Sequence, residues 1–154
     1  MNIVPLADHM TYVDEIAQLH QAEWAHMDRS LTLEHRKAAL REVTDREGIP
    51  SIYIAIDNNK FIGTAAVVEK DLDTHLELGP WISAVYVKEN WRTQGIATKL
   101  VKRCEDQAKK VGIKRLYLST EFASGLYEKL GWHTVEICIY KGVRVHVMCK
   151  VIAS

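Results

Sequence analysis

Apolar positions in the first part of the chain recur with the period of a helix. A short strand is predicted over Ile3 to Leu6, and from Val13 to Trp24 apolar side chains follow at every third or fourth position. This spacing puts them on one stripe of an otherwise polar helix. Thr32 can cap a second helix that runs to about Arg46, and Gly48-Ile49-Pro50 ends it.

The period changes to two after this helix. Alternation from Ser51 to Ile56, turn residues from Asp57 to Lys60 and an apolar run from Phe61 to Val68 predict a β-hairpin. Glu69 to Leu78 is polar and follows neither period, so a loop or a frayed strand end is predicted there. Trp81 to Val87 is a nearly continuous apolar run of strand length, which predicts a buried strand.

Helical and strand patterns alternate in the second half of the chain. A helix is predicted directly after Lys88-Glu89-Asn90, a short strand over Leu116 to Leu118 and a short helix over Ala123 to Leu130. The last predicted element is a hairpin with strands from Val135 to Tyr140 and from Val143 to Lys150.

The order of these elements is β, α, α, β, β, β, α, β, α, β, β, which predicts one mixed sheet flanked by helices. The strand, helix and strand from Trp81 to Leu118 should form a parallel right-handed crossover. The turn at Arg92 to Ala97 then lies beyond the carboxyl end of its strand, where ligands bind in open sheets.

Composition and charge narrow the classes of function. The chain has 154 residues, 47% of them hydrophobic and 26% charged, so a single globular domain over residues 1–154 is expected. Lys plus Arg and Asp plus Glu number 20 each, which disfavours nucleic acid and anionic membranes as partners. The sequence has no signal-peptide pattern and no apolar run near about 18 residues, so a cytoplasmic protein is expected.

Cysteine and histidine spacing gives no sign of a metal. Cys104, Cys138 and Cys149 lack CxxC spacing and are predicted to be buried thiols. The seven histidines are scattered, and none pairs with a carboxylate at the HExxH spacing of a zinc-binding helix. No metal site is therefore predicted.

The turn from Arg92 to Ala97 has the chemistry of an anion site. Amide hydrogens at a helix N-terminus lack helical partners, and the helix dipole there favours negative charge such as phosphate. Gly95 and Ala97 leave room for phosphate to approach the backbone, and Arg92 can add charge-assisted hydrogen bonds. The alternative is an ordinary turn in which Gly95 only permits close packing and Arg92 is a surface charge. The turn matches neither a Walker loop nor a GxGxxG dinucleotide motif.

Two motifs in this order resemble the GCN5-related N-acetyltransferase (GNAT) superfamily. Arg92-x-x-Gly95-x-Ala97 is similar to the family signature (Q/R)xxGx(G/A), and Leu126 to Trp132 resembles a second family element downstream. The resemblance implies an α/β (α+β) fold with a mixed, mostly antiparallel twisted sheet of about six to seven strands, a central splayed parallel pair and about four flanking helices. It also implies acetyl-CoA as co-substrate.

The resemblance further assigns residues to the acyl donor and to proton transfer. Backbone groups of Val85 and Val87 pair with pantetheine like an added strand, and amides from Arg92 to Thr98 hold the pyrophosphate. Tyr127 is similar to the family tyrosine that protonates the departing thiolate when a substrate amine attacks the thioester directly, so no protein nucleophile is required. Packing between the short helix and the sheet is the alternative role for Tyr127. The implied cofactor-binding residues are Val85, Tyr86, Val87, Arg92, Thr93, Gln94, Gly95, Ile96, Ala97 and Thr98.

The base that accepts the amine proton is open. A lysine-like amine has a pKa near about 10.4, so some base or water chain must deprotonate it at neutral pH. Many relatives carry a carboxylate on the central strand, but Trp81-Ile82-Ser83-Ala84 has none. The candidates are Glu77, His75 and Glu121, each with a solvated charge as the alternative. Ser83 or ordered water is a further candidate for relaying the proton.

The acceptor is open as well. In relatives the acceptor pocket is lined by segments that correspond to Trp24, Asp28 and Trp81, whose aromatic and acidic side chains suit a cationic amine, although Trp24 also fits the apolar stripe of the first helix. A primary amine on a small molecule is favoured, and a protein N-terminus or lysine is the alternative. A non-catalytic acyl-CoA-binding regulatory module is the alternative of another class. The last hairpin offers an edge to a second copy, so a monomer or homodimer is expected.

Overall fold

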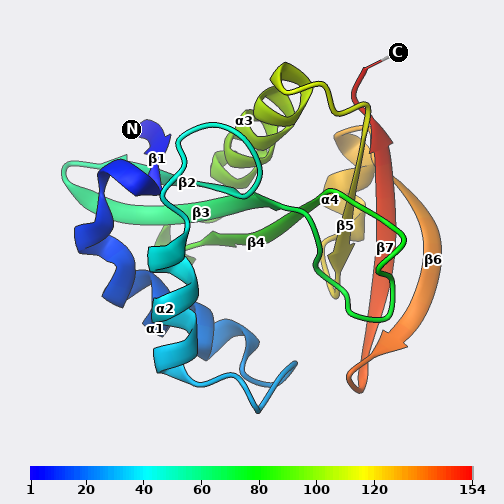
Figure 1. The fold of residues 1–154 in the computed structure, drawn as a ribbon, viewed down its shortest axis with the longest axis horizontal. Coiled ribbons are helices and arrows are strands. Elements are labelled where there is room, and N and C mark those ends of the chain that lie inside the picture. The colour runs from blue at the N-terminus through cyan, green and yellow to red at the C-terminus, as the bar shows by residue number, and fades with distance from the viewer. Residues whose placement is uncertain (154) are drawn as a thin grey trace.

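A computed structural model describes residues 1–153 of the chain (Figure 1). Its centre is one sheet with the strand order β1-β2-β3-β4-β5-β7-β6. Neighbouring strands are antiparallel except for β4 and β5, which run parallel. The strands are β1 (Asn2–Pro5), β2 (Ser51–Asp57), β3 (Lys60–Val68), β4 (Trp81–Val87), β5 (Arg115–Thr120), β6 (His133–Tyr140) and β7 (Val143–Val151).

Four α-helices flank the sheet within the described residues, and this confirms the predicted mixed fold with its central parallel pair. In Figure 1, α1 and α2 lie together on one side of the strands and α3 lies on the other. Over residues 1–153 no helix is both long and apolar enough to cross a membrane. The helices are α1 (Val13–Trp24), α2 (Leu33–Glu42), α3 (Ile96–Lys110) and α4 (Ser124–Lys129).

Alternate side chains of β2 contribute to two separate cores. Ile52 and Ile54 pack with residues of α1 such as Ile16. Tyr53 and Ala55 point to the opposite face and belong to the core beneath α3. Successive residues of a strand face opposite sides of the sheet, so the period-two pattern supplies apolar contacts to both helical layers.

A third apolar cluster lies under the loop that joins β3 to β4. Leu72 of this loop packs with Trp81 and Val147, and the backbone amide of Asp73 donates to the Tyr140 hydroxyl over 3.4 Å. The loop crosses β5 and β7 in Figure 1. The β3–β4 loop, which has no apolar periodicity, therefore covers one face of the C-terminal half of the sheet.

The second helix is shorter than the sequence predicts, because α2 ends at Glu42 and not near Arg46. Val43 already has extended backbone, with φ −85° and ψ 91°. The Tyr53 hydroxyl donates to the carbonyl oxygen of Arg46, and the Arg46 guanidinium pairs with Asp8. These tertiary contacts hold the segment against the sheet in a non-helical path.

The third helix also begins later than predicted. Residues Glu89–Trp91 form a single 3₁₀ turn, and α3 starts only at Ile96. Between them, Thr93 and Gly95 have left-handed backbone with φ values of 64° and 80°. Two left-handed residues cannot continue a right-handed helix, so they form a separate turn ahead of α3.

The prediction that all three cysteines are buried is wrong for one of them. Cys104 and Cys149 are buried, whereas Cys138 is only partly buried. Cys138 lies on β6, the edge strand of the sheet, which has a neighbouring strand on one side. Edge position explains why its side chain is less covered.

Candidate functional site

A bulge in β4 opens the sheet next to the parallel strand β5. Ala84 has a left-handed φ of 54°, and the register between β3 and β4 shifts between Thr64 and Ala66. Among the described residues, β4 and β5 share one register pair, Trp81 with Tyr117. The strands therefore separate beyond this point, as the splayed pair of the sequence prediction requires.

Two side chains hold the bulge. The Thr64 hydroxyl donates to the carbonyl oxygen of Ala84 over 2.9 Å, and His20 Nε2 lies 2.9 Å from the same hydroxyl oxygen. Because the single hydroxyl hydrogen goes to Ala84, Thr64 accepts from His20, whose Nε2 carries the proton. Burial, and then the charge of Arg36, lowers the pKa of His20 to about 3. In the sequence, His20 is marked only by its place at helical spacing between Val13 and Trp24.

The turn that precedes α3 is braced by backbone and side-chain bonds. The Lys88 amide donates to the Ile62 carbonyl oxygen over 2.9 Å, and Arg92 Nε donates to the carbonyl oxygen of Val87 over 2.9 Å. The guanidinium of Arg92 also lies 5.7 Å from the centroid of the Tyr86 ring. Arg92 is thus more than a solvated surface charge, since it fixes the path of the turn.

Gly95 is the N-cap of α3 and takes the left-handed conformation. The first helical bond runs from the Lys99 amide to the Gly95 carbonyl oxygen, and within the described residues no side chain caps the helix. The amides of Ile96, Ala97 and Thr98 therefore have no helical acceptor and are available to an anion.

Packing is not the reason for glycine at position 95. A Cβ added to Gly95 would meet no heavy atom within 4 Å, whereas its φ of 80° is unfavourable for residues with a Cβ. The close-packing alternative for Gly95 is therefore wrong. The open space in front of this backbone matches the prediction that a ligand approaches it closely.

A cavity of about 300 Å³ collects most of the predicted cofactor residues. It contains all of them except Gln94, and it also contains Tyr127 from α4. Sequence reasoning missed four members because they are neither in the turn motif nor at a catalytic position. These additional lining residues are Glu23, Trp91, Ala123 and Leu126.

Tyr127 lies at the wall of this cavity with 5% of its surface exposed. Its ring meets the Trp132 ring edge to face, with centroids 6.3 Å apart. Burial, assisted by the nearby Cys104 thiol, raises the pKa of Tyr127 to about 12. The phenol is therefore protonated at neutral pH and has an O–H to donate at the cavity wall.

Two of the three predicted base candidates are engaged with other side chains. His75 Nε2 lies 3.0 Å from Glu136, and His75 Nδ1 lies 2.7 Å from the Thr74 hydroxyl. Glu121 is 3.0 Å from His26 Nε2. Glu77 is exposed on the loop between β3 and β4. Among the described residues lining the cavity, these three candidates do not occur.

A fourth ionisable residue, Asp71, lies closer to the central strand. Its carboxyl group lies near the side chain of Ser83, a residue next to the β4 bulge, and this side chain favours the ionised form. Asp71 is exposed at the surface, yet partial burial of its carboxyl group raises its pKa to about 6, and the Ser83 side chain opposes this shift only in part. In the sequence, Asp71 is marked only by its position in the polar loop that leads to β4.

The predicted acceptor residues have different environments. Trp24 is half-buried, with its ring 4.8 Å from His20 and 6.2 Å from Tyr86. Asp28 accepts from Lys141 Nζ over 2.7 Å, and this bond, followed by those from Ser30, lowers the pKa of Asp28 to about 2. Trp81 is fully buried and donates its indole N–H to the Leu78 carbonyl oxygen, which favours a core role.

The sheet and cleft described above define the fold of the N-acetyltransferases. The chain resembles an aminoglycoside 6'-N-acetyltransferase complexed with coenzyme A, with a TM-score of 0.80 at 18% identity over 100% of this chain and 98% of that one. It also resembles a ribosomal-protein-alanine N-acetyltransferase from Brucella melitensis, with a TM-score of 0.75 at 16% identity over 98% and 99% of the two chains. At these identities the likeness concerns the fold.

The chain belongs to the acetyltransferase (GNAT) family, whose sequence model matches residues 13–132. A curated relative, N-alpha-acetyltransferase 30 of Schizosaccharomyces pombe, is 34% identical over 93 residues. This match covers 58% of the chain and 58% of the relative, so the chain matches little more than half of that protein's length. Family membership confirms the resemblance inferred from the turn motif.

Proposed function

We propose that this protein is an N-acetyltransferase that moves an acetyl group from acetyl-CoA to a primary amine by direct attack in a ternary complex. The observation that carries the proposal is one cavity that joins the unpaired amides of α3 to the Tyr127 side chain. A coenzyme A thioester needs a phosphate-binding site and a proton donor in one cleft.

The residues at the start of α3 suit the donor. The amides of Ile96 to Thr98 and the helix dipole favour a diphosphate, and Val85 and Val87 offer backbone groups for pantetheine. The Val87 carbonyl oxygen already accepts one bond from Arg92, so its second lone pair is the one left for a ligand. Acetyl-CoA, when bound, supplies the acetyl thioester that reacts.

Tyr127 acts as general acid in this proposal. The amine nitrogen bonds to the thioester carbon, the carbon–sulfur bond breaks, and the phenol gives its proton to the departing sulfur. Its position in the cavity wall supports this role, and with a pKa of about 12 the phenol is protonated when the amine attacks. No cysteine is needed as a nucleophile.

Asp71 with Ser83 acts as the base in place of the carboxylate that β4 lacks. The amine proton passes to Asp71 through the Ser83 hydroxyl, which lies two residues before Val85 in the cleft wall. A carboxyl group with a pKa of about 6 is ionised at pH 7 and matches the demand on a base better than an ordinary aspartate. His75 and Glu121 are each occupied by another side chain.

Two bridges favour an acceptor whose amine is at the end of a molecule. Asp28 bonds to Lys141 of the β6–β7 turn, and His26 bonds to Glu121 after β5, so residues 25–32 are tied down at two points. A segment held at both points suits a small-molecule amine better than an internal lysine on extended backbone. A protein N-terminus is the second candidate, and the 34% identity to an N-alpha-acetyltransferase supports it.

Thiol release from acetyl-CoA across a panel of amines tests the proposal. The panel contains aminoglycosides, peptides with a free N-terminus and N-blocked peptides with an internal lysine, and reactions without acceptor measure background hydrolysis. Turnover of an aminoglycoside or a free N-terminus supports transfer to a terminal amine. Calorimetric binding of coenzyme A with no turnover on any amine would favour a regulatory module, and absence of binding would reject the donor site.

A further inference from the structure

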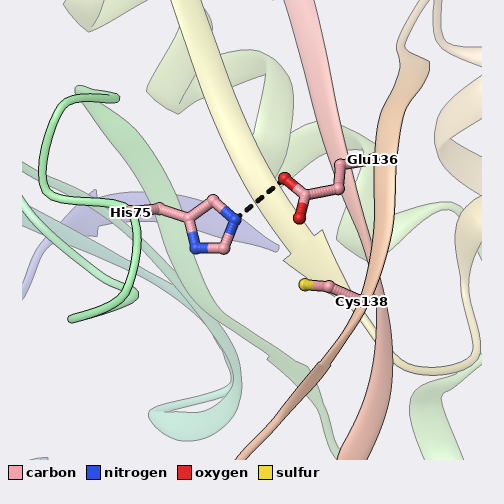
Figure 2. A group of neighbouring side chains, drawn as sticks. All are labelled: His75, Glu136 and Cys138. Atoms are coloured by element: carbon pink, nitrogen blue, oxygen red, sulfur yellow. Dashed lines mark hydrogen bonds and ion pairs between the residues drawn. The ribbon is translucent and has the colours of Figure 1, made fainter.

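Three potential metal ligands meet between the β3–β4 loop and the edge strand β6. Figure 2 shows His75 reaching from the loop toward Glu136 and Cys138, which project from β6 on the same side. Residues two apart on a strand share a face, which explains how Glu136 and Cys138 come to lie together. One ligand atom of each residue lies within 4.8 Å of the other two.

The spacing of these atoms is close to that of a tetrahedral metal centre. Zinc bonds of about 2.0 to 2.3 Å at tetrahedral angles separate ligand atoms by about 3.3 to 3.5 Å. His75 Nε2 and Glu136 Oε2 are 3.0 Å apart, and no pair in the group exceeds 4.8 Å. A metal centre therefore requires the widest pair to close by no more than about 1.5 Å.

The second nitrogen of His75 is held by its neighbour. Thr74 Oγ1 lies 2.7 Å from Nδ1, so the hydroxyl can accept an N–H there, and a metal ion can take the place of the proton between Nε2 and Glu136. Metal-binding histidines commonly have such a partner, which fixes both the ring and its tautomer. Only 9% of the His75 surface is exposed, so the ring has little freedom to turn away.

The same contacts argue against a nucleophilic cysteine. A thiol activated for attack needs a free histidine nitrogen facing it. Both nitrogens of His75 instead have oxygen partners, Thr74 and Glu136.

We propose that His75, Glu136 and Cys138 bind a zinc-class divalent ion, with water completing a tetrahedral site. Imidazole, thiolate and carboxylate together select zinc and its substitute cobalt over magnesium or calcium, which prefer all-oxygen sites. The ion links the β3–β4 loop to the edge strand β6. Sequence spacing does not reveal this group of ligands, because His75 and Glu136 are 61 positions apart.

Cobalt titration of the full reduced chain tests this site independently of catalysis. We expect one equivalent of Co²⁺ to give a sulfur-to-metal charge-transfer band together with the visible bands of tetrahedral cobalt, and Zn²⁺ to displace both. Cys138→Ser should abolish the charge-transfer band. Cys149→Ser is the matched control, because Cys149 is a buried thiol on the adjacent strand β7 outside the group, and it should keep the band.

The supporting hydroxyl gives a graded test. Thr74→Val should weaken Co²⁺ and Zn²⁺ binding by about 10- to 100-fold, as loss of an outer hydrogen-bond partner does at other metal sites. Circular dichroism of each metal-free variant checks that the fold is kept. A missing thiolate band in the parent chain, a band that persists in Cys138→Ser, or a band lost in Cys149→Ser would each overturn the proposal.

Discussion

The proposed donor and acceptor sides of the site are built in different ways. The donor side consists largely of backbone from one continuous stretch, residues 85–98, in which a bulged strand, a left-handed turn and a helix start follow one another. The acceptor side is assembled by side chains from distant segments, such as Asp28 with Lys141, 113 positions apart. A backbone site can be read from a local motif, whereas a side-chain site depends on the finished fold.

Replacing the proposed base should have the largest effect on the acceptor side. Asp71→Asn should lower turnover by about 10²- to 10⁴-fold, because the amide cannot accept the amine proton. In the parent enzyme kcat/KM should fall about tenfold per pH unit below pH 6, since the pKa of Asp71 is about 6 and only its ionised form is active.

Asp73→Asn is the control for this prediction, because Asp73 lies on the same loop and is exposed. Steady-state rates of Asp73→Asn, measured from pH 5 to 9, should show the same pH profile as those of the parent enzyme. If Asp71→Asn retained the acidic limb, the base would have to be a different group.

Replacing the proposed acid tests a residue shared by both sides. Tyr127 lines the donor cavity, and its proposed role is to protonate the leaving group. Tyr127→Phe should lower turnover by roughly 10- to 10⁴-fold while calorimetric binding of coenzyme A is kept. Tyr140→Phe is a matched control, since Tyr140 is a buried tyrosine in the separate cluster under the β3–β4 loop. Equal rates for Tyr127→Phe and the parent would reject the acid role.

The backbone character of the donor side can be tested at Gly95. Gly95→Ala should weaken coenzyme A binding by roughly 10- to 100-fold, equivalent to losing one hydrogen bond to a charged group, because the new methyl stands before the amides. Left-handed strain of about 1–2 kcal/mol should accompany it.

Gly112→Ala separates these two effects. Gly112 also has positive φ and open space around an added Cβ, but it follows the opposite end of α3. It should share the loss of stability in thermal unfolding without the loss of coenzyme A affinity. Equal affinity losses in both variants would mean that strain alone acts on binding.

The smallest predicted effect concerns the bulge that supports both sides. The pKa of His20 is about 3 in the fold and 6.5 when unperturbed, so between these values the unfolded chain binds more protons. The free energy of unfolding should therefore fall as pH drops below 6.5, by about 1.4 kcal/mol per pH unit at most from this group.

His20→Gln should flatten this pH dependence, because glutamine can still donate to Thr64 but does not titrate. His133→Gln, at an exposed position on β6, is the control. Urea unfolding at several pH values measures both. An unchanged slope in His20→Gln would mean that other groups cause the loss of stability in acid.

Most of the fold could be predicted from the sequence, because apolar periods reflect the faces of strands and helices directly. The predicted helix boundaries differ from the structure where tertiary contacts or left-handed residues determine the backbone conformation. Arg46 is drawn out of α2 by Asp8 and Tyr53, and Thr93 and Gly95 delay the start of α3. Neither effect has a local signature, since each depends on partners or dihedral angles that the pattern does not encode.

The candidate site divides in the same way. The turn motif and Tyr127 were found because their residues are adjacent in sequence or fixed by a family pattern, and the cavity brings them together. Asp71 was missed because an aspartate in a polar loop looks like a solvated charge until Ser83 and the surrounding protein are in place. The pairing of His75 with Glu136 was invisible for the same reason.

The bridge between Asp28 and Lys141 makes the acceptor side responsive to dissolved salt. Its two side chains retain 23% and 36% exposure, so mobile ions reach them and weaken the attraction. Raising ionic strength should thus make residues 25–32 more mobile and change the rates at which acceptors bind and dissociate. Tolerance of bulky acceptors would then depend on the medium in which the protein works as well as on its shape.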